Sequence, residues 1–127
     1  MNIIEKKNNY KCFVFDYYGT LFDPDKLGEN KFFDGVFELI KETSDNYLCA
    51  LATRTPLSIV KSQLENFGLL NYFSSIKSTE LAHDKPDPTM FNEILFELAI
   101  NPEDAIMIGD NISDLAFADN AGSDSIF

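Results

Sequence analysis

The sequence is poor in basic residues. Ten lysines and arginines, with Arg54 the only arginine, stand against 21 acidic residues, and the formal net charge is -11. A surface of this kind has little with which to neutralise phosphates, which argues against a nucleic-acid-binding protein. By itself an acidic surface indicates no more than solubility.

Cysteines are few and long apolar runs are missing. Cys12 and Cys49, the two cysteines, lie inside short apolar runs, where a thiol behaves as a small buried hydrophobic group. We therefore expect no disulfide framework and a reducing cytoplasmic environment. No segment has the apolar length of a membrane span, and the first ten residues lack the apolar core of a signal peptide. A soluble protein without membrane contact is expected.

The size of the chain points to one domain. Its 127 residues, 45% of them hydrophobic, are enough for one compact core and too few for two. We predict a single domain over residues 1–127. Three short runs are apolar on both faces, which is typical of central strands in a covered parallel sheet. They comprise residues 11–15, 47–52 and 105–109.

Helical patterns alternate with these strands. Apolar residues spaced three and four apart predict helices within 31–44, 56–68, 88–100 and 111–121. The stripe of the first consists of Phe33, Val36, Phe37 and Ile40. In the third, Asp87 is the predicted N-cap, and Pro88 would occupy the first position.

Weaker strands are predicted at 73–76 and at 123–127, the second at a sheet edge. The alternation of strand and helix predicts an α/β fold, a three-layer doubly wound parallel sheet with right-handed crossovers. Ligands bind beyond the carboxyl ends of the strands in such sheets. That rule directs attention to the polar residues at the strand ends.

Five polar residues are expected to meet there: Asp16, Thr53, Lys85, Asp110 and Asp114. Carboxylates suit a hard divalent cation, most plausibly Mg²⁺. A lysine and a hydroxyl suit the oxygens of a phosphoryl group. Together they describe phosphoryl transfer through an aspartyl-phosphate. Each has an ordinary structural alternative, such as a turn, a helix cap or a surface charge. Their common position at strand ends favours a site.

Four motifs in order make the sequence resemble the haloacid dehalogenase-like (HAD) superfamily from about Lys11 to Phe127. They are FDYYGT, LATRT, DKPDP and IGDNISD. The set is specific, although any one motif alone would be weak. The resemblance implies a HAD-like Rossmannoid core and a hydrolase, most plausibly a phosphatase acting on a phosphorylated small molecule or macromolecule.

The resemblance also implies a role for each matching residue. Asp16 would be the nucleophile, with Thr53 and Lys85 as catalytic phosphate ligands. The Mg²⁺ ligands would be Asp16, Asp110, Asp114 and the backbone carbonyl of Tyr18. Arg54, next to Thr53, is our candidate for a bidentate contact to an anionic substrate.

Tyr18 departs from the phosphatase pattern, which has an aspartate two residues after the nucleophile. A phenol is a poor general base at neutral pH, and loss of such a group typically costs about 10² to 10⁴ in rate. Two alternatives to a phosphatase therefore stay open. One is a binding or regulatory protein that hydrolyses weakly or not at all. The other is a 2-haloacid dehalogenase. The DxYGT pattern and Asn111, a candidate substrate ligand, resemble the motifs of that branch. Against it, Asp110 would be a metal ligand that dehalogenases lack.

The short segment between Thr20 and Phe33 leaves no room for a cap domain. Caps exclude water and select substrate in small-molecule members of the superfamily. We therefore expect a capless core whose open site is covered either by a large substrate or by a second copy in a homo-oligomer.

Overall fold

The computed structural model of the protein describes residues 10–78 and 85–126. Within them, five parallel strands form one sheet in the order β3-β2-β1-β4-β5. The strands are β1 (Cys12–Phe15), β2 (Leu48–Thr53), β3 (Ser75–Ser78), β4 (Ala105–Ile108) and β5 (Asp124–Ile126). The doubly wound parallel sheet predicted from the alternating pattern is confirmed.

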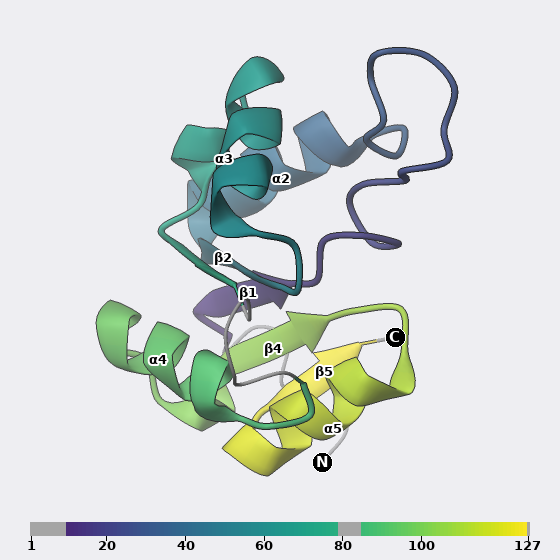
Figure 1. The fold of residues 1–127 in the computed structure, drawn as a ribbon. Helices are drawn as coiled ribbons and strands as arrows, with labels where there is room; N and C mark the ends of the chain where they lie inside the picture. The colour runs from purple at the N-terminus through teal and green to yellow at the C-terminus, as the bar shows by residue number, and fades with distance from the viewer. Residues whose placement is uncertain (1–9, 79–84, 127) are drawn as a thin grey trace.

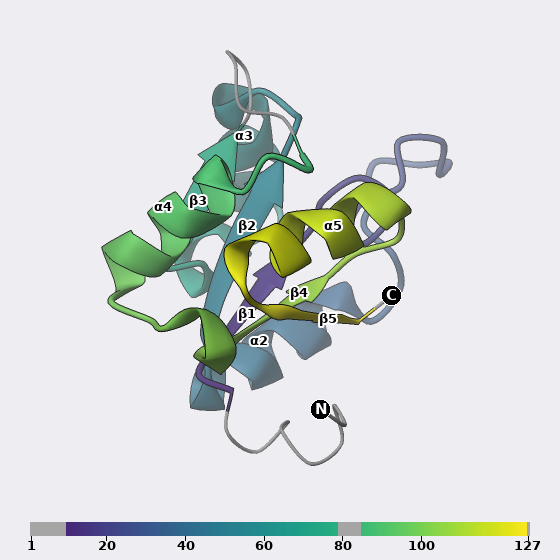
Figure 2. The same cartoon turned by 90° about the horizontal axis from the view of Figure 1, so that it is seen from below.

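Helices cover both faces of the sheet, which gives three layers. They are α2 (Val36–Asn46), α3 (Leu57–Asn66), α4 (Thr89–Leu98) and α5 (Ile112–Ala121), with short 3₁₀ turns at Leu70–Tyr72 and Pro102–Asp104. Helices α2 and α3 pack on one face, and α4 and α5 on the other (Figures 1 and 2). Within the described ranges no helix is both long and apolar enough to cross a bilayer.

The core is split into two clusters by the sheet. Cys12 and Val14 of β1 belong to the cluster under α4 and α5, while Phe15 belongs to the cluster under α2 and α3. This follows from the alternation of side chains along a strand. Cys49 of β2 lies in the second cluster, so the two buried cysteines occupy opposite faces and are free thiols. The expectation of no disulfide between them is confirmed.

The first helix is shorter than its sequence pattern suggested. Helix α2 begins at Val36, directly after Gly35, whose φ of 84° places it in the left-handed region. Phe33 therefore precedes the helix, and both Phe33 and Phe37 are exposed. The prediction that Phe33 belongs to the helical stripe was wrong, because the glycine turn places it before the helix, whereas Phe37 lies in the helix as predicted.

Two other elements begin later in the chain than predicted. Strand β3 starts at Ser75 and not at Phe73. Helix α4 starts at Thr89, one residue after the expected first position, but the Asp87 side chain still accepts the Thr89 backbone N–H at 2.9 Å. The loop expected at residues 83–88 begins outside the described residues. At the C-terminal side, α5 and the edge strand β5 agree with the prediction.

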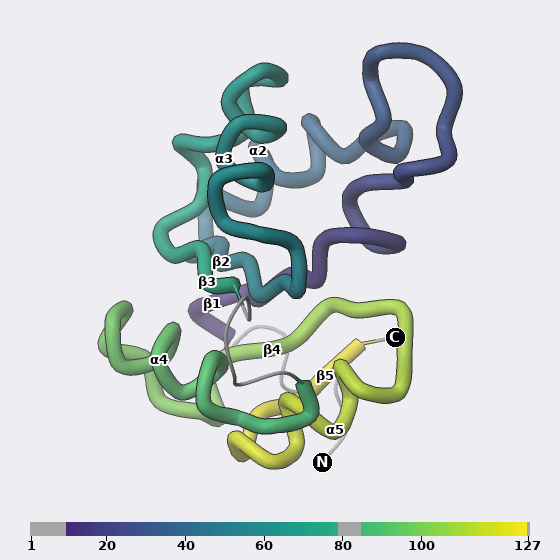
Figure 3. Tube along the Cα trace, in the orientation of Figure 1, coloured from purple at the N-terminus to yellow at the C-terminus, as the bar shows by residue number. Residues whose placement is uncertain are grey.

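The segment between β1 and α2, residues 16–35, extends as a loop from the body of the molecule (Figure 3). An isolated antiparallel bridge pairs Phe22 with Phe32 and closes its base. Lys26 Nζ donates to the Phe32 carbonyl at 2.7 Å, and Lys31 Nζ donates to the Lys26 carbonyl at 2.6 Å. No domain is inserted there, as predicted.

Candidate active site

The site lies where the direction of the chain through the sheet reverses. From the central strand β1 the chain passes to β2 and β3 on one side and returns to β4 and β5 on the other. Ligands of doubly wound sheets bind at this point, beyond the carboxyl ends of the strands. The Asp16 backbone N–H donates to the Ile108 carbonyl at 2.9 Å, so the ladder of β1 and β4 continues to Asp16. The side chain of Asp16 is thus held at the reversal.

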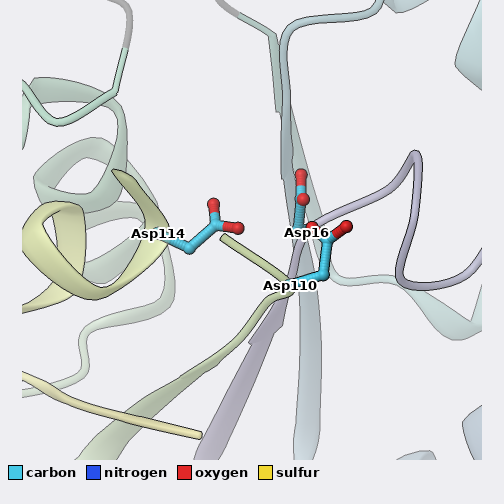
Figure 4. Close-up of side chains that lie close together, drawn as sticks. All are labelled: Asp16, Asp110 and Asp114. Carbon is cyan, nitrogen blue, oxygen red and sulfur yellow. The ribbon is translucent and has the colours of Figure 1, made fainter. Parts of the chain in front are cut away.

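Three carboxylates meet there, from Asp16, Asp110 and Asp114. One oxygen from each lies within 4.8 Å of the others. Asp110 follows β4, and Asp114 reaches in from the first turn of α5, as Figure 4 shows. Sequence reasoning alone left open that Asp114 was a solvated acid, but its side chain is buried.

Lys85 lies between two of these acids. Its Nζ is 2.9 Å from Asp16 Oδ1 and 2.8 Å from Asp114 Oδ1, and its side chain is almost fully buried. The ammonium also lies 5.6 Å from the centroid of the Phe117 ring. Burial raises the pKa of Asp114, and the hydrogen bond from Lys85 opposes that rise. A single buried cation thus compensates two buried acids.

The space between the carboxylates fits a small hard cation. Asp114 Oδ2 is buried without a hydrogen-bond partner, and a buried carboxylate oxygen of this kind calls for a ligand. A Cβ at Gly19 would lie 3.0 Å from Asp110 Cγ, and one at Gly109 would lie 2.6 Å from Asp114 Cγ. Only glycine therefore leaves room for these carboxylates. An all-oxygen donor set of this composition suits Mg²⁺.

Asn111 sets the entry of α5. Its side-chain oxygen accepts the Asp114 backbone N–H at 3.3 Å and also the Ser113 hydroxyl. This is an N-cap, which fixes the first turn of the helix and therefore the direction of the Asp114 side chain. The same cap accounts for Asn111 without any contact to a substrate.

The end of β2 contributes hydroxyls. Thr53 Oγ1 accepts the Thr55 backbone N–H at 3.0 Å, and the Ser78 hydroxyl donates to the Thr55 carbonyl at 2.7 Å. Thr53 and Thr55 are buried, whereas Arg54 between them is exposed. The turn after β2 is therefore fixed, with its side chains directed to different surroundings.

A cavity of about 250 Å³ connects these groups. Its lining consists of Asp16, Tyr18, Thr53, Arg54, Thr55, Lys85, Asn111 and Ser113. The six predicted site residues other than Asp110 and Asp114 thus line one pocket, next to the acidic cluster. Sequence reasoning missed Thr55 and Ser113. The second threonine of LATRT and the serine after Asn111 were the available signals.

Fold and site together define a Rossmann-like α/β protein with a lysine-bridged acidic crevice at its topological switch point. The chain belongs to the family described as haloacid dehalogenase-like hydrolase, which it matches over residues 1–127. The resemblance seen in its four motifs is therefore confirmed.

Several relatives carry phosphatase names. The chain is 35% identical over 89 residues to a phosphoglycolate phosphatase of Psychrobacter arcticus, covering 69% of this chain and 39% of the relative. It is 30% identical over 93 residues to the pyrophosphatase PpaX of Bacillus velezensis, covering 68% and 43%. The chain thus spans about two fifths of the length of these curated relatives.

Solved structures show the same fold. A HAD-superfamily hydrolase of subfamily IA, variant 1, from Geobacter sulfurreducens superposes with a TM-score of 0.79 at 18% identity. The match covers 91% of this chain and 88% of the other. The agreement extends over nearly all of the sheet and its helices.

Proposed function

We propose that the protein is a Mg²⁺-dependent phosphatase that works through an aspartyl-phosphate on Asp16. The observation that carries the proposal is the position of Lys85, whose ammonium lies within hydrogen-bond distance of Asp16 and Asp114 at the wall of one pocket. A buried cation beside a carboxylate is suited to hold phosphoryl oxygens next to a nucleophile. The phosphatase names of the relatives support the same activity.

Different residues of the pocket would bind different parts of the substrate. Lys85 and the Thr53 hydroxyl would hold the phosphoryl oxygens, and Arg54 at the mouth would contact an anionic part of the substrate. The ligands proposed for Mg²⁺ are Asp16, Asp110, Asp114 and the Tyr18 carbonyl. When bound, the ion neutralises charge between the attacking carboxylate and the phosphoryl group.

Two displacements complete the reaction. An Asp16 carboxylate oxygen attacks phosphorus, the bond from phosphorus to the leaving oxygen breaks, and that oxygen keeps the electron pair. Water then attacks the acyl-phosphate, which releases inorganic phosphate and restores the Asp16 carboxylate. Lys85, which is buried and within hydrogen-bond distance of Asp16 and Asp114, would bind the phosphoryl oxygens in both steps.

Tyr18 limits the choice of leaving group. The side chain two residues after the proposed nucleophile is a phenol in place of a carboxylate, so the second step lacks the usual general base. Leaving groups that are stable as anions need no proton from the enzyme. Acyl phosphates, phosphoanhydrides and aryl phosphates meet that requirement.

The proposal is tested by hydrolysis of acetyl phosphate and p-nitrophenyl phosphate with and without Mg²⁺. We expect turnover that needs Mg²⁺ and is abolished in Asp16→Asn, whose amide cannot form the acyl-phosphate. Turnover that persists in purified Asp16→Asn would overturn the assignment.

Tyr18 also favours a second candidate, a binding or regulatory protein that retains the site without efficient hydrolysis. This candidate predicts that Mg²⁺ with beryllofluoride binds, that multiple turnover is absent, and that Tyr18→Asp gains hydrolysis. Faster turnover of a broad phosphate panel by wild type than by Tyr18→Asp would exclude it. Release of halide from 2-chloropropionate without metal would instead establish a dehalogenase.

The partner of the open pocket is also a proposal. Without an inserted domain, the pocket would be covered by the substrate itself, if it is large, or by a second copy of the chain. Size-exclusion chromatography with light scattering, with and without a phosphate mimic, distinguishes the two. Two reduced, buried thiols are consistent with action in the cytoplasm.

A further inference from the structure

Tyr18 is the aromatic residue among those that line the pocket. About 40% of its surface is accessible, whereas its neighbour Tyr17 is fully buried. We propose that the Tyr18 ring is a stacking platform that selects aryl phosphates, in which a planar ring is bonded directly to the phosphoryl oxygen. The proposal rests on the phosphatase function proposed above and names its substrate class.

The ring is held in one orientation by stacking. It lies 5.3 Å from the Phe22 ring, centroid to centroid, at an interplanar angle of 19°. The Tyr17 ring lies 5.5 Å away at 26°. Two near-parallel aromatic neighbours leave the ring little freedom to turn, since rotation would give up both contacts. A fixed ring loses little entropy when a ligand stacks on it.

The layer beneath is itself anchored. Tyr17 and Phe22 stack on each other at 5.3 Å, and the Tyr17 hydroxyl donates to Gln63 Oε1 at 2.9 Å. Phe32 packs edge-on against Phe22 at 5.2 Å and 89°. The Gly19 backbone N–H donates to the Phe22 carbonyl at 2.8 Å, which ties the chain after Tyr18 to the same layer. The platform is thus built on core residues.

The position of the ring fits a leaving group. Tyr18 is two residues beyond Asp16, so its backbone lies at most about 7 Å along the chain from that of the nucleophile. Both residues line the same pocket, together with Lys85 and Thr53, the proposed phosphate ligands. A ring attached to the departing oxygen would therefore meet the exposed part of Tyr18.

Leaving-group chemistry points the same way independently. An aryl oxide delocalises its negative charge into the ring, so it departs with less help from a proton donor than an alkoxide does. The site presents a phenol where a carboxylic acid would otherwise supply that proton. A substrate with an aryl leaving group satisfies both the chemical limitation and the aromatic surface.

The test uses phosphonates, which occupy a phosphate site and cannot be hydrolysed. Binding of phenylphosphonate, cyclohexylphosphonate and methylphosphonate is measured by titration calorimetry in buffer with Mg²⁺. We expect phenylphosphonate to bind roughly tenfold more tightly than either of the others. Tyr18→Phe keeps this preference and Tyr18→Leu loses it. Phe96→Leu, which removes a 90% exposed ring outside the pocket, keeps it.

The outcomes separate the two proposals. Equal binding of all three phosphonates by wild type, or a preference that survives in folded Tyr18→Leu, would overturn the platform and leave the phosphatase assignment intact. If no phosphonate binds, the proposed phosphate site is refuted, and the proposal for Tyr18 is refuted with it. Circular dichroism spectra confirm that each variant is folded.

Discussion

The Lys85 ammonium lies 2.8 Å from Asp114 Oδ1, and both side chains are almost completely buried. The same nitrogen contacts Asp16. We expect Lys85→Met to lower the free energy of unfolding by about 3–5 kcal/mol, because it leaves two buried acids without a cation. Urea unfolding followed by circular dichroism measures the loss.

Lys61→Met is the matched control, because Lys61 is exposed on α3 and its loss should change stability by less than about 0.5 kcal/mol. Mg²⁺ should recover part of the stability of Lys85→Met, since a divalent ion between the carboxylates replaces the lost charge. Equal free energies of unfolding for Lys85→Met and Lys61→Met would contradict the conclusion that Lys85 stabilises the two buried acids.

Gly19 and Gly28 offer a test of the proposed metal cradle, the space that the glycines leave for the carboxylates of Asp110 and Asp114. Both have positive φ values, 85° and 94°, so alanine at either position costs about 1–2 kcal/mol of stability. A Cβ at Gly19 would meet the Asp110 carboxylate, whereas one at Gly28 would meet nothing within 4 Å. We therefore expect Gly19→Ala, and not Gly28→Ala, to weaken Mg²⁺ binding about 10- to 100-fold in calorimetric titrations. Equal Mg²⁺ affinity in both variants would refute the cradle.

Asn120 is expected to position Lys85. Its side-chain N–H donates to the Pro86 carbonyl at 3.1 Å, which ties the loop after Lys85 to α5. Asn120→Ala should raise the KM for a phosphate substrate several-fold while leaving Mg²⁺ affinity unchanged, because the loop follows Lys85, the proposed phosphate ligand. The control is Asn92→Ala, on the exposed side of α4. A fall in kcat with unchanged KM would exclude a positioning role.

The two cysteines should be unreactive in the folded protein. Burial raises the pKa of Cys12 from 9.0 to about 12 and that of Cys49 to about 11. At pH 8, Ellman's reagent should modify neither thiol until urea unfolds the chain. Because the thiol pKa values are higher in the folded than in the unfolded state, the contribution of these groups to the free energy of unfolding is complete below pH 9. It declines as pH rises from 9 toward 11–12. Immediate labelling of both thiols in native protein would contradict their burial.

The strands and the position of the proposed nucleophile could be predicted from the sequence. Apolar runs on both faces identify β1, β2 and β4, and the polar residue after β1 is Asp16. Such patterns are local, so they can be read without knowledge of tertiary contacts. The edge strand β3 was predicted to begin two residues too early, because Ser75 and Lys77 weaken its apolar pattern.

What escaped sequence reasoning depends on distant contacts. The burial of Asp114 results from Lys85, which is 29 positions away in sequence, and from the tight approach of Gly109. The aromatic layer under Tyr18 requires Phe32, which returns through the bridge to Phe22. Phe33 was wrongly assigned to the helix because an apolar stripe does not reveal where a glycine turn ends.

The loop between Phe22 and Phe32 is closed at its base and exposed at its tip. The Asp23 backbone N–H donates to the Lys31 carbonyl at 2.8 Å, and the Phe33 N–H donates to the Leu21 carbonyl at 3.0 Å. Leu27 at the tip is 92% exposed. Extra polypeptide spliced in beside Leu27 would therefore emerge from two anchored stems without shifting the strand that precedes them. This hairpin is a ready acceptor site for building a lid of chosen specificity onto the molecule.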